Sequence, residues 1–365
     1  MWYTDYNALK ERVDVLRKML SDRCAELEVD ETQVHNEFFK DIVVRAVHES
    51  NWQEGIELNI GKTQELADAA FDDVEQINGP HLDMQNVLRR HRDVVVKLKR
   101  AGKSEEEIAT YNLARAHFAI SWIFQELSRR EIAAYAHVVN QLATALQAHE
   151  QEIPEEVREK VKNAFQLIEK HKQADAPVHF PLTGKQANQG ELTRELLKLD
   201  FQVLLKPMKV DYIHFLHALV LMGILPVKSC GKFRKTGVHV GNPDLYFPPP
   251  TAIPKIMEAY CDNFPHLLSE QTREDPIKTA AKISHRFVAI HPYRDGNGRV
   301  SRLLMNLILT GHFPPVYLKA DKKGRHRYGQ AIRRADRGNI EPLAALIAMS
   351  IIEIYEKMLN SLQAH

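Results

Sequence analysis

Apolar residues recur every three to four positions along much of this 365-residue chain, the spacing that places them on one face of an α-helix. Residues 30–53 follow this spacing, and Gly55 can end the helix that they predict. A capping box, Ser104 with Glu107 three positions later, precedes a second helical block. Asp275 followed by proline is a typical helix start and precedes a third. The pattern therefore predicts a mainly α-helical protein.

Two of the predicted helices are joined by a short loop. The helix after Asp275 should end at His291, because Pro292 disfavours helical geometry in the residue before it. The apolar spacing resumes at Val300, and Gly311 can close the second helix. The loop between them should therefore lead into a helix N-terminus, where backbone N–H groups are available to an anion.

Three other stretches complete the outline. Helical spacing continues in residues 154–171 and 191–221. The prolines and glycines of residues 172–190 predict a linker between them. Residues 231–247 alternate apolar and polar side chains around a turn, which predicts a small β-hairpin.

Composition and charge exclude several classes of function. With 44% hydrophobic and 27% charged residues, the chain has an ordinary globular composition. Its 49 basic and 48 acidic residues give a net charge of +1, so any attraction to nucleic acid or to an anionic membrane would have to be local. The N-terminus lacks the pattern of a signal peptide and no apolar run can span a bilayer, so we expect a cytoplasmic protein. Three widely spaced cysteines indicate neither disulfides nor a zinc site.

Polar and charged side chains are concentrated in residues 291–302, which read His-Pro-Tyr-Arg-Asp-Gly-Asn-Gly-Arg-Val-Ser-Arg. His291 can accept a proton near neutral pH. The carboxylate of Asp295 suits a Mg²⁺ ion that also contacts phosphate oxygens. Gly296 and Gly298 allow backbone N–H groups to turn toward an anion. The loop therefore has the groups needed to handle a nucleoside triphosphate.

Two arginines follow the glycines. Arg299 and Arg302 stand three positions apart at the start of the second helix, so their guanidinium groups share one face and can bind successive phosphates. The simpler reading is a helix–loop–helix connector with a glycine turn, but a plain turn does not require so many polar groups.

The segment resembles the signature of the Fic family, His-Pro-Phe-x-Asp/Glu-Gly-Asn-Gly-Arg-x-x-Arg, with Tyr293 at the phenylalanine position. The resemblance implies transfer of AMP from ATP to a Ser, Thr or Tyr hydroxyl of a protein. In this scheme His291 is the catalytic base, Asp295 holds Mg²⁺, and Asn297 is catalytic because it stabilises charge on the α-phosphate. The implied nucleotide-binding residues are Gly296, Asn297, Gly298, Arg299, Arg302 and Tyr328. The extra hydroxyl of Tyr293 needs a hydrogen-bond partner if it is buried.

Two further segments extend the resemblance. The predicted hairpin is similar to the Fic flap, an edge that can pair with an extended target segment through backbone hydrogen bonds. Residues 328–339 are similar to the closing helix of the family, which touches the nucleotide base, although Gly329 and Asp336 replace its usual tyrosine and asparagine. The expected target-binding residues of the flap are Val238, His239 and Val240.

Ser50 and Glu54 match an inhibitory segment that some Fic proteins carry before the core, Ser/Thr-x-x-x-Glu followed by Gly or Asn. Both residues share one face of the helix predicted over residues 30–53. The resemblance implies that Glu54 pairs with Arg302. A guanidinium held by a carboxylate cannot also bind the γ-phosphate, so we expect an autoinhibited enzyme.

These assignments define the expected fold: a mainly α protein with a Fic-type helical core, a small β-hairpin flap and added N-terminal helices. The expected divisions are an N-terminal helical region with the inhibitory helix (1–84), a helical elaboration with the linker (85–194), the Fic core (195–350) and the end of a C-terminal helix (351–365).

Other functions remain open at this point. The same site could remove AMP from a modified protein, with Glu54 orienting water, or transfer a different nucleotide. A nucleotide-gated adaptor without enzymatic activity is the third alternative. The expected partner is a protein with a hydroxyl side chain, and self-modification and a homodimer are open by family analogy. We expect no membrane partner and no nucleic acid, and we expect His214 and His217 to be structural.

Overall fold

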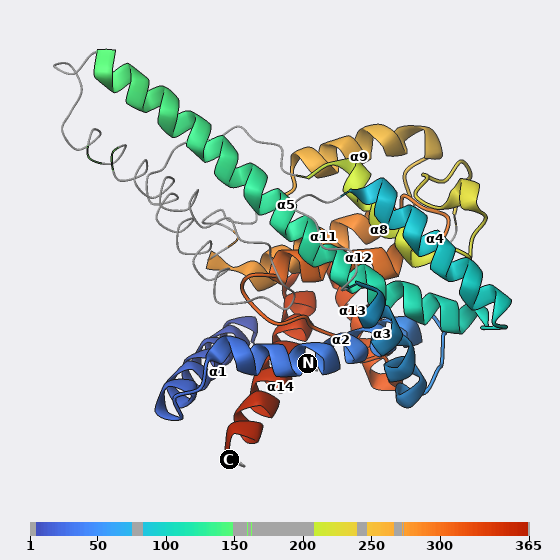
Figure 1. Ribbon diagram of the computed structural model, residues 1–365, viewed down its shortest axis with the longest axis horizontal. Coiled ribbons are helices and arrows are strands. Elements are labelled where there is room, and N and C mark those ends of the chain that lie inside the picture. Colours follow the sequence, from blue (N-terminus) through green and yellow to red (C-terminus); the bar gives the residue numbers. More distant parts are fainter. Residues whose placement is uncertain are drawn as a thin grey trace.

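The computed structural model describes residues 5–74, 83–148, 208–238, 247–265 and 274–363, with the single positions 159, 162 and 272 (Figure 1). Within these ranges the chain forms α-helices and two short 3₁₀ helices, η1 (Val227–Ser229) and η2 (Pro250–Ala252), and no strand. The expected mainly α-helical fold is confirmed. The helices are α1 (Tyr6–Glu26), α2 (Glu31–Gln53), α3 (Ile60–Val74), α4 (Met84–Arg100), α5 (Glu105–Ala148), α8 (Val210–Leu221), α9 (Ile253–Asp262), α11 (Pro276–Ile290), α12 (Asn297–Leu309), α13 (Lys322–Ala335) and α14 (Glu341–Gln363).

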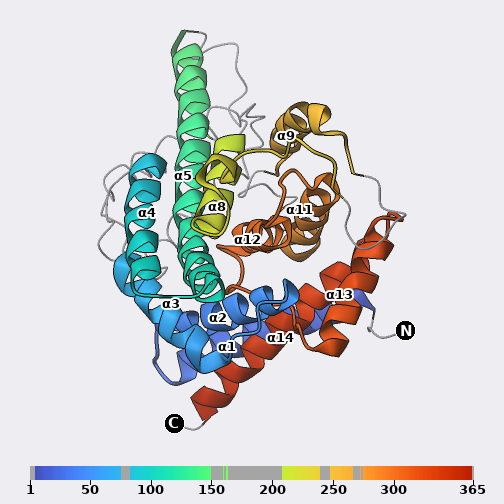
Figure 2. The same cartoon turned by 90° about the vertical axis from the view of Figure 1, so that its right-hand side faces the viewer.

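Helix α12 lies at the centre of the described fold (Figure 2). Every residue from Arg299 to Leu309 is buried, so this helix presents no solvent-exposed face after its first turn. Helices α2, α5, α8 and α11 all pack against it. Because α12 begins inside the 291–302 motif, the burial of apolar surface along the helix also fixes the position of that loop.

The N-terminal helix is tied to the core at the other end of α11. Helix α1 packs along α14, and the hydroxyl of Tyr6 donates a hydrogen bond to Asp275 Oδ1 at 2.6 Å. The same carboxylate caps α11, because it accepts from the backbone N–H of Lys278. The first helix of the chain and the helix that carries His291 therefore share one polar contact.

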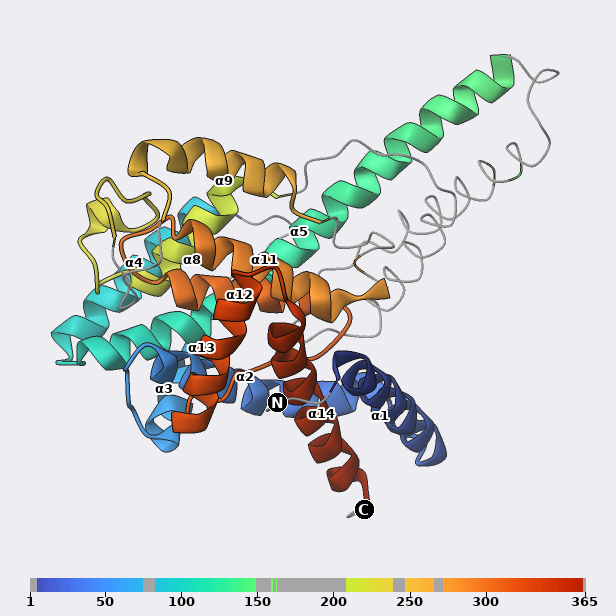
Figure 3. The same ribbon diagram turned by 180° about the vertical axis from the view of Figure 1, so that it is seen from behind.

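Helix α5 is much longer than its neighbours. Its N-terminal half packs against α2, α3, α8 and α12, whereas its C-terminal end projects away from the other described helices (Figures 1 and 3). Helix α4 lies beside α8 in the same views. In the portions of the chain that the structure describes, no helix is both long and apolar enough to cross a membrane.

The local helix signals are confirmed. Asp30 caps α2. Ser104 and Glu107 form the reciprocal capping box, with distances of 2.9 and 3.2 Å. Helix α11 starts at Pro276, and His291 is its C-terminal cap. Helix α14 runs without a break past residue 350.

The β-hairpin prediction is wrong for residues 231–238, the first part of the predicted hairpin. Residues 231–238 form a loop without a strand, in part because the backbone N–H of Arg234 donates to the carbonyl of Pro292 and not to a neighbouring strand. His239 and Val240 lie outside the described residues, as do the predicted linker and most of the 154–171 helix. Of the 191–221 prediction, Val210–Leu221 is helical.

Candidate active site

His291 ends helix α11 in the left-handed region of backbone conformation, with φ of 49° and ψ of 58°. Its backbone N–H still donates to the carbonyl of Phe287, so the residue closes the last helical turn. A non-glycine residue seldom adopts positive φ, and such residues are concentrated at functional sites. This conformation turns the chain sharply into the motif loop.

Asn297 closes the loop through its side chain. Its Oδ1 accepts from the backbone N–H of Tyr293 at 3.0 Å, and its Nδ2 donates to the carbonyl of Tyr293 at 2.9 Å. The residue is only 2% exposed. The structure therefore gives Asn297 a part in shaping the loop, while its expected action on a phosphate stays a prediction.

Both glycines of the motif occupy positions where a side chain would clash. Gly296 is the N-terminal cap of α12 with φ of 76°, and a Cβ there would overlap Leu221. A Cβ at Gly298 would overlap the carboxylate of Glu54. The absence of a side chain at position 298 therefore leaves room for a carboxylate directly against the backbone of the loop.

The hydroxyl of Tyr293 has the partner that its burial requires. Tyr293 is 0% exposed, and its hydroxyl lies 2.8 Å from Nδ1 of His214. Its ring stacks on His217 with 3.8 Å between centroids. The replacement of the family's phenylalanine is thus accompanied by a polar partner on α8.

His217 joins two loops of the site and is structural, as predicted. Its Nδ1 accepts from the backbone N–H of Gly231 at 2.8 Å. A neutral ring that accepts at Nδ1 carries its proton on Nε2, which lies 3.1 Å from the carbonyl of Asp295 and donates to it. Burial lowers the pKa of His217 to about 3, so this neutral form persists at neutral pH.

Arg234 is a residue of the site whose role the sequence did not reveal. Its side chain is buried and donates to three backbone carbonyls, those of His291, Thr236 and Pro248, at 2.8, 3.0 and 2.6 Å. It therefore fastens the loop after α8 to the end of α11. Arg234 stands between Phe233 and Lys235, and its partners are backbone carbonyls, two of them in distant segments, so residue types and spacing do not reveal the role.

Arg299 has unused hydrogen-bonding capacity in a buried position. It is 3% exposed, and its Nη2 lies 3.5 Å from Asp295 Oδ1. Its Nε and Nη1 are buried and have no hydrogen-bond partner among the residues that the structure describes. Buried donors without partners are costly, so these two atoms fit a site that accepts an anion.

Arg302 is bound by residues at the end of α2. Its Nε donates to Ser50 Oγ at 2.8 Å, and its Nη2 donates to the Ser50 carbonyl at 3.0 Å and to Glu54 Oε1 at 2.5 Å. The side chain of Arg302 is 7% exposed and that of Glu54 26%. The structure thus brings together the three residues that the resemblance linked, and it places the Glu54 carboxylate over Gly298 as well.

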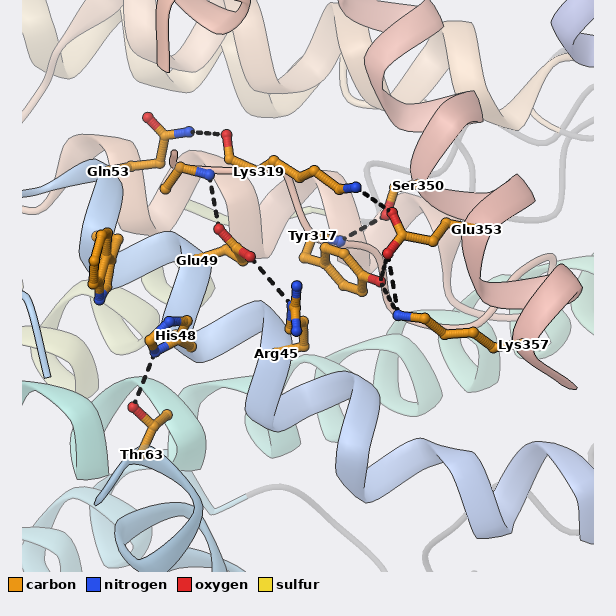
Figure 4. Close-up of polar contacts among 12 residues, drawn as sticks. Arg45, His48, Glu49, Gln53, Thr63, Tyr317, Lys319, Ser350, Glu353 and Lys357 are labelled. Carbon is orange, nitrogen blue, oxygen red and sulfur yellow. Dashed lines mark hydrogen bonds and ion pairs between the residues drawn. The ribbon is translucent and has the colours of Figure 1, made fainter. Parts of the chain in front are cut away.

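The end of α2 that carries Ser50 and Glu54 is anchored to the segment before α13 (Figure 4). Glu49 Oε2 accepts from the backbone N–H of Ala320 at 2.7 Å, and Gln53 Nε2 donates to the carbonyl of Lys319 at 3.1 Å. Glu49 is 9% exposed. Lys319 in turn pairs with Glu353 of α14 at 2.8 Å. These contacts hold the end of α2 to the segment before α13 and, through Lys319, to α14.

The remaining predicted residues are placed as follows. Tyr328 is half-buried on α13 near Arg302 and Glu54, and burial raises the pKa of its hydroxyl. Asp336 is paired with His285 Nε2 at 2.8 Å.

Asp295 is half exposed, and its Oδ1 accepts from Gly296 N. Val238 is in the loop described above, and Phe247, beyond the undescribed part of that loop, lies 4.6 Å from the His291 ring between centroids.

The surroundings of the His291 ring favour its neutral form near pH 7. Burial lowers its pKa, the Val288 carbonyl opposes that shift, and the charge of Arg234 adds to it. Glu54 and Asp295 raise the pKa more weakly. A neutral imidazole is the form that accepts a proton.

Comparison with known proteins agrees with this geometry. The family model described as "Fic/DOC family" matches residues 207–309, which include α8, α11, the loop and α12. The fold resembles that of a Fic domain containing signaling protein from Bacteroides thetaiotaomicron, with a TM-score of 0.52, 14% identity, and coverage of 95% of this chain and 98% of that one. Residues 207–309 therefore match the Fic/DOC family, and the fold agrees with that match.

Curated relatives carry an enzymatic name. The chain is 37% identical over 135 residues to "Protein adenylyltransferase Fic" of Culex quinquefasciatus, and 38% identical over 141 residues to the protein of that name from Nematostella vectensis. These alignments cover 36% and 38% of this chain but only 25% and 31% of those proteins. The match thus spans about a quarter to a third of the relatives' length.

Proposed function

We propose that the protein is a protein adenylyltransferase, which transfers AMP from ATP to a Ser, Thr or Tyr hydroxyl of a protein, and that Glu54 autoinhibits it. The observation that carries the proposal is the juxtaposition of a neutral His291, the glycine loop and the unsatisfied buried guanidinium of Arg299. The name of the curated relatives supports the same reaction.

In the proposed reaction His291 accepts the proton of the target hydroxyl. The target oxygen then forms a bond to the α-phosphorus of ATP, the bond from that phosphorus to the bridging oxygen breaks, and pyrophosphate leaves. Backbone N–H groups at the start of α12 stabilise the charge that develops on the α-phosphate oxygens. Arg234 holds the His291 backbone in place through its carbonyl.

The residues present fit a triphosphate with a divalent cation. The two unpartnered nitrogens of Arg299 can donate to phosphate oxygens. Asp295 would hold Mg²⁺, which neutralises phosphate charge when bound. Among the described residues no group of three or more His, Cys, Asp or Glu side chains could hold a metal ion, so further ligands would come from phosphates and water.

Autoinhibition follows from competition for Arg302. The Glu54 carboxylate takes one donor of this guanidinium and lies against Gly298, in space that phosphate oxygens of a productively bound triphosphate would need. A charge-assisted hydrogen bond of this kind contributes roughly 1.5 to 3 kcal/mol. The protein as isolated should therefore have low transfer activity.

Removal of AMP from a modified protein is the second candidate. The position of the Glu54 carboxylate over the loop favours it, because a carboxylate there could accept a proton from an attacking water. The two reactions leave different products: a gain of AMP on the target or its loss.

The proposal is tested by incubating the Glu54→Gly protein and a lysate with ATP labelled at the α-phosphate. Label should enter protein with Glu54→Gly, and the Glu54→Gly, His291→Ala double variant should bind ATP but transfer none. Transfer that survives without His291 would refute the assigned base.

A further inference from the structure

A groove separates helix α4 from the end of α8 and the loop that follows it. It encloses about 790 Å³. Its α4 wall presents Arg89, Arg90 and Arg92, and its opposite wall presents Met222, Val227 and Cys230. None of these residues belongs to the nucleotide site described above. The groove is therefore a separate surface feature.

The groove is strongly basic although the chain is almost neutral. Three arginines of helix α4 line it, Arg89, Arg90 and Arg92, whereas Lys97, Lys99 and Arg100 of the same helix lie outside it. Lys228 and Lys232 belong to the chain segment that carries Val227 and Cys230 of the opposite wall, and both are exposed. Among the described residues that line the groove, the one acidic side chain is that of Asp83, whose Oδ1 already accepts from the backbone N–H of Asn86. The positive charge that the sequence as a whole lacks is gathered here.

Most of this charge is available to a ligand. Arg89 donates to the neutral amide of Asn86 at 2.9 Å. Arg92, Lys228 and Lys232 form no ion pair with any carboxylate in the described part of the chain. Exposed cations that no carboxylate neutralises attract acidic partners and set the rate of encounter with them.

The walls fit a polypeptide better than a nucleic acid. Leu88, Met222 and Val227 give the groove apolar surface, and Val227 is 60% exposed. No aromatic side chain is among the described residues that line it, whereas single-stranded nucleic acid is usually held by stacking on aromatic rings. A peptide with carboxylates and a few apolar side chains would match both the charge and the apolar surface.

The groove is connected to the active site through a few residues of chain. Cys230 lines it, the next residue, Gly231, donates to His217, and Arg234 donates to the carbonyl of His291. A segment bound in the groove would therefore lie against the base of the loop that borders His291.

We propose that this groove docks an acidic segment of the protein substrate and so presents a neighbouring hydroxyl to His291. The link to a substrate rests on the proposed transferase function, whereas the docking itself does not. The surface makes recognition depend on charge, so binding should weaken as salt screens the groove.

The test measures binding without catalysis, by fluorescence anisotropy of a labelled polyglutamate peptide. The unmodified protein should bind it, with affinity falling when salt is raised from about 50 to about 200 mM. The Arg89→Glu, Arg92→Glu variant should bind about tenfold more weakly. The Lys97→Glu, Arg100→Glu variant changes the same charge on the same helix outside the groove, and it should bind within about twofold of the unmodified protein. Circular dichroism checks that both variants fold.

Three results would overturn the proposal: no binding by the unmodified protein, equal loss in both variants, or equally tight binding of a single-stranded oligonucleotide. The peptide assay stands apart from transfer activity. If the peptide binds as expected but the Glu54→Gly protein transfers no AMP to any protein, the docking surface stands and the proposed function fails.

Discussion

Arg302 and Glu54 lie 248 positions apart in the sequence and meet in one hydrogen bond of 2.5 Å between Nη2 and Oε1. Ser50, one helical turn before Glu54, binds the same guanidinium through its hydroxyl and its carbonyl. The two ends of this interaction belong to different parts of the fold, α2 and the buried central helix α12. The hydrogen bonds of one arginine therefore link the N-terminal region to the proposed nucleotide site.

Loss of the Glu54 carboxylate should release Arg302 for phosphate binding. Glu54→Gln keeps the size of the side chain but removes its charge, and we expect the transfer rate to rise about tenfold, since roughly 1.5 kcal/mol corresponds to that factor. The rate is measured with labelled ATP. Glu57→Gln is the matched control, because Glu57 lies nearby and only approaches exposed Arg325, at 3.9 Å. Equal transfer rates for Glu54→Gln and the unmodified protein would contradict autoinhibition by Glu54.

Glu49 should affect the same autoinhibition indirectly, because it holds the end of α2 in place. Glu49→Gln weakens the bond to the Ala320 N–H and the pair with Arg45, so the end of α2 should hold Glu54 less firmly. We expect a severalfold rise in transfer rate, on the order of 1 kcal/mol. In the Glu54→Gly protein the same substitution should have no further effect, because the two changes act through one contact. Additive effects would show that Glu49 acts elsewhere.

The pH dependence of transfer should report the environment of His291. Burial lowers the pKa of this ring, and the neutral ring is the active base, so the rate should fall only when the pH drops below the usual histidine value of about 6.5. Glu54 raises the pKa of His291, so removal of Glu54 should lower that pKa and move the fall in transfer rate to lower pH. The measurement is the pH–rate profile of the Glu54→Gly protein. A fall in rate with its midpoint above about pH 6.5 would contradict this electrostatic account.

Tyr293 and His214 should stabilise the fold as a pair. His214→Ala leaves the fully buried Tyr293 hydroxyl without its partner, which should cost about 1 to 3 kcal/mol of unfolding free energy, in addition to the packing of the ring. In the Tyr293→Phe protein no hydroxyl remains to be left unpaired, so the same histidine substitution should cost less. Urea unfolding of the four proteins in this cycle measures the difference. An identical loss of unfolding free energy on His214→Ala in both backgrounds would contradict the pairing of Tyr293 with His214.

The sequence predicted those features that depend on nearby residues. The caps of α5 and α11 follow from side chains within three positions of the helix start, and Pro292 ends α11 through steric contact with its neighbour. The loop between α11 and α12 followed in the same way. Its local signals are strong because glycine and proline restrict the backbone directly.

Features that depend on distant contacts were found only in part. The pairing of Glu54 with Arg302 was expected from the family resemblance and not from spacing. The roles of Arg234 and Glu49 were missed, because their partners are backbone groups of remote segments, which leave no trace in residue type. The hairpin prediction failed in residues 231–238 because alternation of side chains does not reveal where the backbone hydrogen bonds go.

The most direct test of the central claim is intact-mass analysis of proteins incubated with ATP and Mg²⁺ and the Glu54→Gly enzyme. A target protein, or the enzyme itself, should gain the mass of one AMP group, and the gain should vanish when His291→Ala is added. No AMP adduct on any protein, or an adduct that persists without the His291 imidazole, would contradict the account.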